Sequence, residues 1–263
     1  MDLDGAVVAV TGASRGIGAA VANAVAARGA RLGLIARTGH DLDGVLGNLG
    51  VEGVAVTADI ADRSATIDAV AEVEAALGPI DVLVANAGIG AYGPFVDMSY
   101  EELERLVSVN VLGTMYAVKA VLPGMVARRR GHVVTIGSIA GRIGSPFEAA
   151  YSATKFAGVG FTEALAVEVA PYGVAVSLVN PGVVATEFGN ARGHPYDRDR
   201  PKPISAESVA SAVVAAIEAG SAETYVPRWF RSAVVTRHLV PPLFRWGTAR
   251  SFRADLKADS AKR

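Results

Sequence analysis

Short apolar runs alternate with amphipathic segments along most of the chain. The runs are rich in β-branched residues, as in Ala6-Val7-Val8-Ala9-Val10, a pattern that suits strands covered on both faces of a parallel sheet. Between them, apolar residues recur every three or four positions, which predicts helices. We expect strands at 6–10, 31–36, 51–58, 80–85, 132–136, 174–179 and 224–226. We expect helices at 17–28, 61–77, 100–107, 111–128, from 151 to before Pro171, and 206–219. The alternation predicts an α/β fold with one doubly wound parallel sheet of about seven strands and helices on both faces.

Composition narrows the function classes further. With 263 residues, 51% of them hydrophobic, the chain can bury one large core. A net charge of −1 gives no electrostatic reason to expect a nucleic-acid partner. Cysteine is absent and the four histidines lack ligand spacing, so we expect no disulfide and no metal site. The N-terminus lacks a signal-peptide pattern and no eighteen-residue apolar run occurs, which together predict a cytoplasmic protein.

A glycine-rich turn follows the first predicted strand and opens the first helix. It reads Thr11-Gly12-Ala13-Ser14-Arg15-Gly16-Ile17-Gly18. Missing side chains let such a backbone approach a pyrophosphate, and the helix N-terminus supplies free amides. We therefore expect a dinucleotide site at Gly12, Ser14, Arg15, Gly16, Ile17 and Gly18. The alternative is a tight strand–helix connection without a ligand.

The ends of the second and third strands bear on which dinucleotide binds. Arg37 stands where an NAD site would place a carboxylate, and an arginine there can pair with a 2′-phosphate, with Arg15 adding a second positive charge. NADP is the expected cofactor, NAD the less favoured one, unless both arginines are solvated loop residues. Asp59, after the third strand, is either an acceptor for an adenine amino group or a helix cap.

A phenol and an ammonium share one helix face at Tyr151-Ser152-Ala153-Thr154-Lys155, because residues four apart lie side by side. At about 5 Å and an effective dielectric near 20, the lysine charge would lower the tyrosine pKa by about two units. Tyr151 would then act as a general acid towards a carbonyl. Ser138, at the carboxyl end of the fifth strand, could donate to the same oxygen. By itself the pentapeptide also fits an ordinary surface helix.

Taken in order, these motifs resemble the short-chain dehydrogenase/reductase family over residues 5 to 226. The shared positions are the glycine turn, Asn86-Ala87-Gly88, Asn110, Ser138, Tyr151-x-x-x-Lys155 and Pro181-Gly182-x-x-x-Thr186. The resemblance implies a Rossmann fold, hydride transfer on a nicotinamide, and assembly as a homodimer or homotetramer.

The resemblance also implies roles for single residues. Tyr151 would be the acid–base, Lys155 its pKa-lowering partner and a ribose ligand, Ser138 the donor to the substrate oxygen, and Asn110 the holder of a relay water. Further cofactor contacts would come from Ile60, Asn86, Ala87, Gly88, Pro181, Gly182, Val184 and Thr186.

Two other functions fit the same fold. A non-catalytic NADP sensor would not need Ser138, Tyr151 and Lys155 together, and sugar-nucleotide epimerases usually have a different glycine spacing. Six apolar residues flank the expected site and suggest an apolar carbonyl compound or secondary alcohol, unless they are core packing. They are Ile89, Tyr92, Phe95, Ile139, Phe147 and Phe188.

Residues 227–263 form a basic and apolar extension beyond the expected domain at 1–226. This segment contains nine Lys or Arg and two Asp. It therefore has a net charge of +7, and the rest of the chain has a net charge of −8. Pro241-Pro242 should prevent one continuous helix. The apolar residues would cover the substrate pocket or a neighbouring subunit, or else rest on an anionic membrane surface.

Overall fold

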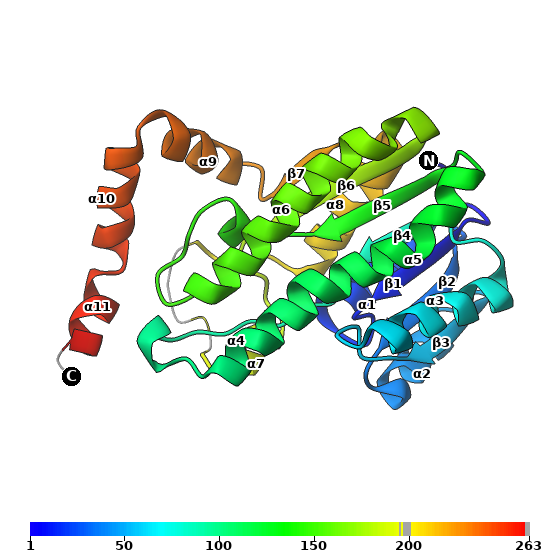
Figure 1. Cartoon of the computed structure of the whole chain (residues 1–263), viewed down its shortest axis with the longest axis horizontal. Coiled ribbons are helices and arrows are strands. Elements are labelled where there is room, and N and C mark those ends of the chain that lie inside the picture. The colour runs from blue at the N-terminus through cyan, green and yellow to red at the C-terminus, as the bar shows by residue number, and fades with distance from the viewer. Residues whose placement is uncertain (195, 197–200, 261–263) are drawn as a thin grey trace.

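The computed structural model describes residues 1–194, 196 and 201–260, and its centre is a seven-stranded sheet (Figure 1). The strands are β1 (Val7–Thr11), β2 (Arg31–Ala36), β3 (Gly53–Thr57), β4 (Val82–Ala85), β5 (Gly131–Ile136), β6 (Val174–Pro181) and β7 (Glu223–Val226). They pair in the order β3-β2-β1-β4-β5-β6-β7, and each pairing is parallel. The predicted doubly wound sheet is confirmed.

Helices cover both faces of this sheet. One core layer lies between the sheet and α1 (Gly16–Ala26), α2 (Gly39–Gly47) and α8 (Ala206–Ala219). The other lies beneath α3 (Arg63–Leu77), α5 (Thr114–Ala127) and α6 (Ala149–Val169). Because both faces are covered, strands such as β1 are buried at every position, and this explains their unbroken apolar runs.

The strand order reverses between β1 and β4, which lie side by side although β2 and β3 intervene in the chain. Ligands of open α/β sheets bind at the carboxyl ends of the strands at such a switch point. Here that edge holds the glycine turn after β1 and the Asn86 segment after β4. The topology therefore brings together two motifs that are 75 residues apart.

Several element boundaries differ from the sequence prediction. Helix α2 was not expected. Helix α3 begins at Arg63 rather than at residue 61, because Asp62 is its N-cap and accepts a hydrogen bond from the amide of Ala65. The segment around Asn110 is not a break between two helices, since a π-helical stretch (Ser108–Gly113) joins α4 (Tyr100–Val107) to α5.

The joined helix Tyr100–Ala127 is long and apolar enough to cross a membrane by length and composition alone. That observation is weak evidence, because a core helix of a water-soluble domain passes the same test. Within α5, Ala117, Val118, Val121 and Met125 are buried against the sheet, so their apolar character is already explained by packing.

The chain continues after β7 into three further helices, α9 (Phe230–Leu239), α10 (Pro241–Ser251) and α11 (Arg253–Ser260). The expected interruption at Pro241 is present, since α9 ends at Leu239 and Pro241 opens α10. In Figure 1 these helices, coloured orange to red, leave the sheet near β7 and run past the loops at the carboxyl ends of the strands.

Candidate cofactor and active site

A cavity of about 1040 Å³ opens along the carboxyl edge of the sheet. It runs from the glycine turn and Arg37 to the fifth and sixth strands, where Ser138, Tyr151 and Thr186 lie. Every predicted catalytic or cofactor residue lines this cavity except Gly18 and Asn110. Its size is at the upper end of the roughly 300 to 1,000 Å³ common for ligand pockets, which leaves room for two ligands side by side.

Two glycines of the turn, Gly12 and Gly18, have no space for a side chain. A Cβ atom on Gly12, whose φ is +66°, would lie 2.8 Å from Cα of Ala87. On Gly18 it would lie 2.1 Å from the carbonyl oxygen of Gly12, so Gly18 allows α1 to pack on the turn rather than facing the ligand. Helix α1 has no side-chain cap, and its first amides remain available to a pyrophosphate.

Thr11 and Asn86 connect the two loops of the switch point. The Thr11 hydroxyl accepts hydrogen bonds from the amides of Asn86 (3.0 Å) and Ala87 (3.1 Å). The Asn86 side chain donates to the carbonyls of Thr11 (2.9 Å) and Gly12 (3.2 Å). Asn86 thus contributes to the site by holding the glycine turn in shape.

Asp59, near Arg37 at one end of the cavity, has two hydrogen-bond donors. Asp59 accepts hydrogen bonds from the Arg105 guanidinium (2.7 Å) and from the amide of Ala61 (3.0 Å). Burial raises the pKa of Asp59, but these two donors outweigh it, and the pKa lies below the ordinary value. Asp59 is not the helix cap, since Asp62 has that role.

Of the two arginines expected at the 2′-phosphate, one is engaged elsewhere. Arg15 forms an ion pair with Glu187 at 3.0 Å, and both side chains are largely exposed. Exposed pairs of this kind contribute little free energy, so the pair could open at small cost. The case for NADP therefore depends mainly on Arg37, which lines the cavity after β2.

Ser138, Tyr151 and Lys155 converge at the other end of the cavity. Ser138 ends the β5 segment and shares a hydrogen bond with the Tyr151 hydroxyl. A Cβ on Gly141 would lie 2.7 Å from the Lys155 carbonyl oxygen, so only glycine lets the Ser138 segment pack directly on α6. The Lys155 ammonium lies 5.9 Å from the centre of the Tyr151 ring and donates to the Ile136 carbonyl at 3.0 Å.

The expected lowering of the Tyr151 pKa is wrong for this structure. Burial is the largest influence and raises the pKa of Tyr151 well above its ordinary value, while the Ser138 hydrogen bond opposes this rise. Burial also lowers the pKa of Lys155 to about 8. The Coulomb argument neglected that both groups leave water, which penalises the phenolate and the ammonium alike. Tyr151 therefore keeps its proton at neutral pH, as a general acid must.

Asn110 is buried and does not line the cavity. Its side chain exchanges two hydrogen bonds with the backbone of Ile89 (2.8 and 2.9 Å) and donates to the Thr154 hydroxyl at 3.0 Å. Thr154 in turn donates to the Tyr151 carbonyl at 2.7 Å. These bonds use the Nδ2 group twice and the Oδ1 atom once, and the relay-water role of Asn110 remains a prediction. A π-helical turn at such a position is common at functional sites.

Four of the six apolar residues expected around a substrate line the cavity: Ile89, Tyr92, Ile139 and Phe188. Phe147 is not part of its lining but packs behind it, with its ring centre 5.7 Å from that of Tyr92 and 6.5 Å from that of Phe252. Phe95 does not line the cavity either, since it lies in a short 3₁₀ turn and is 58% exposed. Its expected place beside the substrate is therefore wrong.

Some residues that support the site were not predicted from the sequence. Thr11 and Thr154 belong to the glycine-turn and Tyr151–Lys155 motifs, so their position within these motifs could have indicated a structural role. Arg105 and the partly buried ion pair between Arg192 and Glu148 had no local signal, because the interacting residues are more than 40 positions apart.

Known proteins share both this sequence pattern and this fold. The family model for short chain dehydrogenases matches residues 6–197. The chain is 35% identical over 191 residues to 3-oxoacyl-[acyl-carrier-protein] reductase FabG of Escherichia coli, covering 73% of this chain and 78% of that protein.

Solved structures agree with this assignment. A short chain dehydrogenase/reductase from Burkholderia phymatum in complex with NAD has a TM-score of 0.84 at 26% identity, covering 92% of this chain and 96% of the other. One from Burkholderia cenocepacia in complex with NADP has a TM-score of 0.82 at 28% identity, covering 94% and 99%. The cavity, its residues and these matches lead to one conclusion: the chain belongs to the short-chain dehydrogenase/reductase family, whose members are nicotinamide-dependent oxidoreductases acting on CH–OH and C=O groups.

Proposed function

We propose that this protein is an NADP(H)-dependent reductase of an apolar carbonyl compound, with Tyr151 as the general acid. The observation that carries the proposal is the hydrogen-bonded pair of Ser138 and Tyr151 at the inner end of the cavity, with Lys155 beside it. When bound, the reduced nicotinamide supplies the hydride for the carbonyl carbon. The residues of this chain bind and orient the cofactor and the substrate, and they protonate the carbonyl oxygen.

The two hydroxyl groups act where negative charge develops. As the carbonyl oxygen becomes an alkoxide, hydrogen bonds from Ser138 and Tyr151 strengthen and lower the barrier. Tyr151 then gives its proton to that oxygen. Its raised pKa keeps the proton in place until the alkoxide, a stronger base, has formed.

Lys155 and Thr186 would hold the nicotinamide half of the cofactor. Lys155 reaches the cavity next to Gly88, where a Cβ would lie 3.6 Å from its ammonium nitrogen. The missing side chain at Gly88 keeps open the space in which a ribose hydroxyl would meet that ammonium. Thr186 lies across the cavity next to Gly16, within the segment expected to bind the carboxamide.

NADPH is expected to bind more tightly than NADH, because charge-assisted hydrogen bonds from Arg37 to the 2′-phosphate contribute roughly 1.5 to 3 kcal/mol. Arg37→Ala should weaken NADPH binding about tenfold to a hundredfold and leave NADH binding nearly unchanged. Arg31→Ala, at the opposite end of β2, is the matched control for losing a cation. Isothermal titration measures the affinities of the three proteins for both cofactors, and equal affinities for both cofactors in the unmodified protein would show the assignment to be wrong.

Substrate-dependent oxidation of NADPH tests the reaction itself. A panel of ketones and aldehydes should include compounds that accelerate the loss of absorbance of NADPH. A protein that binds NADPH but oxidises it with none of them would be a sensor. A sugar-nucleotide epimerase would instead convert its substrate without net consumption of the cofactor.

A further inference from the structure

One face of helix α10 forms a wall of the cavity. The residues that line it are Phe244, Gly247, Thr248, Ser251 and, directly after the helix, Phe252. They are spaced at i, i+3, i+4, i+7 and i+8, which places them on one side of a helix. At 1.5 Å per residue this wall is about 12 Å long. Because the same cavity contains Ser138 and Tyr151, the wall belongs to the substrate side of the site.

The basic character of the extension does not reach this wall. Within the described part of the extension, the residues that line the cavity are all uncharged, and they include Phe230, Thr236, Leu243, Phe244 and Phe252. Trp246 and Arg250 lie on the opposite side of α10, with the Arg250 guanidinium 5.7 Å from the Trp246 ring centre, and Arg245 is also exposed. The cavity side of the helix is thus uncharged, with Phe244 and Phe252 as its large apolar side chains, while its arginines are exposed.

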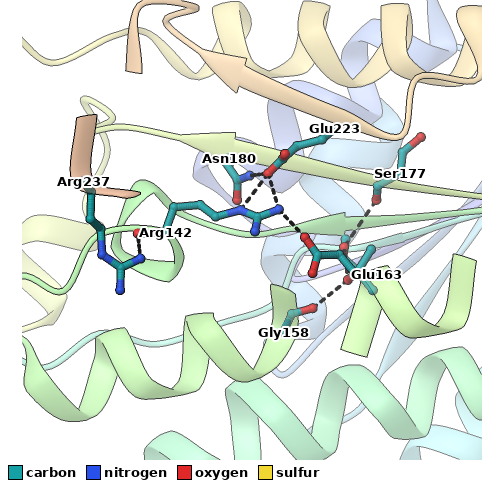
Figure 2. Close-up of polar contacts among 9 residues, drawn as sticks. Arg142, Gly158, Glu163, Ser177, Asn180, Glu223 and Arg237 are labelled. Carbon is teal, nitrogen blue, oxygen red and sulfur yellow. Dashed lines mark hydrogen bonds and ion pairs between the residues drawn. The ribbon is translucent and has the colours of Figure 1, made fainter. Parts of the chain in front are cut away.

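Polar contacts attach the extension to the catalytic loop, as Figure 2 shows. Arg237 of α9 donates to the carbonyl of Arg142, which directly follows the Ser138 turn. The Arg142 guanidinium is itself held by Glu163 of α6 (2.7 Å) and Glu223 of β7 (2.8 Å). The Arg237 guanidinium also lies 5.0 Å from the ring centre of Phe156. The position of α9, and through it of α10, is therefore tied to the loop that carries Ser138.

A strained residue faces α10 from the body of the protein. Phe147 has a φ of +64°, a conformation that is unusual for a bulky side chain and costs of order 1 to 3 kcal/mol. Its carbonyl accepts a hydrogen bond from Gly93, and its ring centre lies 6.5 Å from that of Phe252. Strain of this size persists where it places a side chain usefully, and here it directs an aromatic ring towards the wall.

We propose that the cavity side of α10 and Phe252, with Phe147 packed against Phe252, forms a subsite for an extended apolar chain attached to the carbonyl group of the substrate. This inference deepens the proposed reductase function and rests on it. The apolar side chains of Leu243, Phe244 and Phe252 in this wall expose surface to water until an apolar group covers them, and each buried methylene contributes favourably to binding. A substrate chain is the occupant that the geometry favours, since the wall is continuous with the reacting end of the cavity.

The test compares methyl ketones of increasing length, from 2-butanone to 2-dodecanone, at saturating NADPH. In the unmodified protein, kcat/KM should rise about three- to fourfold for each added methylene until the wall is covered. In the double variant Phe244→Ala with Phe252→Ala, the ratio of kcat/KM for 2-dodecanone to kcat/KM for 2-butanone should be at least tenfold smaller than in the unmodified protein. Trp246→Ala, on the outer face of the same helix, is the matched control and should keep the full dependence on length.

A second variant tests the attachment of the helix. Arg237→Gln should reduce the advantage of the long ketones and leave the rate with 2-butanone unchanged, because Arg237 contacts the Arg142 carbonyl rather than the reacting atoms. An unmodified protein that reduces short and long ketones with equal kcat/KM would overturn the subsite and leave the reductase function intact.

The reductase function and the subsite can be tested separately. If no ketone is reduced, the reductase function fails. The subsite is then judged by calorimetric binding of 1-dodecanol against 1-butanol to the protein with NADPH, where equal affinities overturn it and a preference for 1-dodecanol lost in the phenylalanine variant supports it.

Discussion

Replacing Tyr151 by phenylalanine is expected to lower turnover by at least about a hundredfold while NADPH affinity stays nearly unchanged. The substitution removes the hydroxyl that shares a hydrogen bond with Ser138, and with it the proton donor. The ring remains, so its packing beside Phe188, with ring centres 5.8 Å apart, should persist. Steady-state kinetics and calorimetric titration of NADPH measure the two quantities separately.

A second phenol in the cavity provides the control for this prediction. Tyr92 lines the same cavity and stacks on Phe147 at 5.7 Å between ring centres, without belonging to the Ser138 pair. Tyr92→Phe should therefore keep most of the turnover. Turnover of the Tyr151→Phe variant equal to that of the unmodified protein would remove Tyr151 from the mechanism.

Lys155→Met is expected to reduce both cofactor affinity and turnover strongly, because the ammonium would hold the nicotinamide ribose. The same variant should also reveal the pKa of Lys155, which burial lowers from its ordinary value near 10.5 to about 8. Between these two values the unfolded chain binds a proton that the folded protein has released. The free energy of unfolding of the unmodified protein should therefore rise with pH in this window, relative to that of the variant.

The difference between the two free energies is expected to grow by up to about 3 kcal/mol from pH 8 to pH 10. This value is an upper bound, because part of the Lys155 side chain faces the cavity. Denaturant unfolding at a series of pH values measures it. Lys119→Met, at an exposed position of α5, is the control for removing a lysine. A flat difference between the Lys155 variant and the unmodified protein would show that Lys155 does not leave water in the folded state.

The fold could be predicted from sequence because its determinants are local and periodic. A parallel sheet covered on both faces requires unbroken apolar strands, and runs such as residues 6–10 show this without any tertiary information. The order of strands and helices then leaves few possible topologies. Boundaries were less certain where a cap decided them, as at Asp62, which begins α3 two residues later than expected.

The residues of the candidate site could be named from sequence for a related reason. Glycines in a turn, and a tyrosine four positions before a lysine, express requirements of backbone space and helix geometry that are visible within a few residues. Their environment could not be read in the same way. The pKa values of Tyr151 and Lys155 depend on burial by segments distant in the chain, and the Coulomb estimate had the wrong sign for Tyr151 as a result.

What the sequence by itself determined about this protein is its sheet, its glycine turn and the Tyr151–Lys155 pair, since each depends on interactions between near neighbours in the chain. Only the tertiary structure decided where the apolar residues and the basic residues of the extension lie. The sequence allowed α10 to face a membrane, another subunit or the pocket. Contacts between residues 95 positions apart, such as Arg237 with Arg142, hold α9 to the segment after Ser138. One uncharged side of α10 then lines the cavity, while Arg245 and Arg250 are exposed.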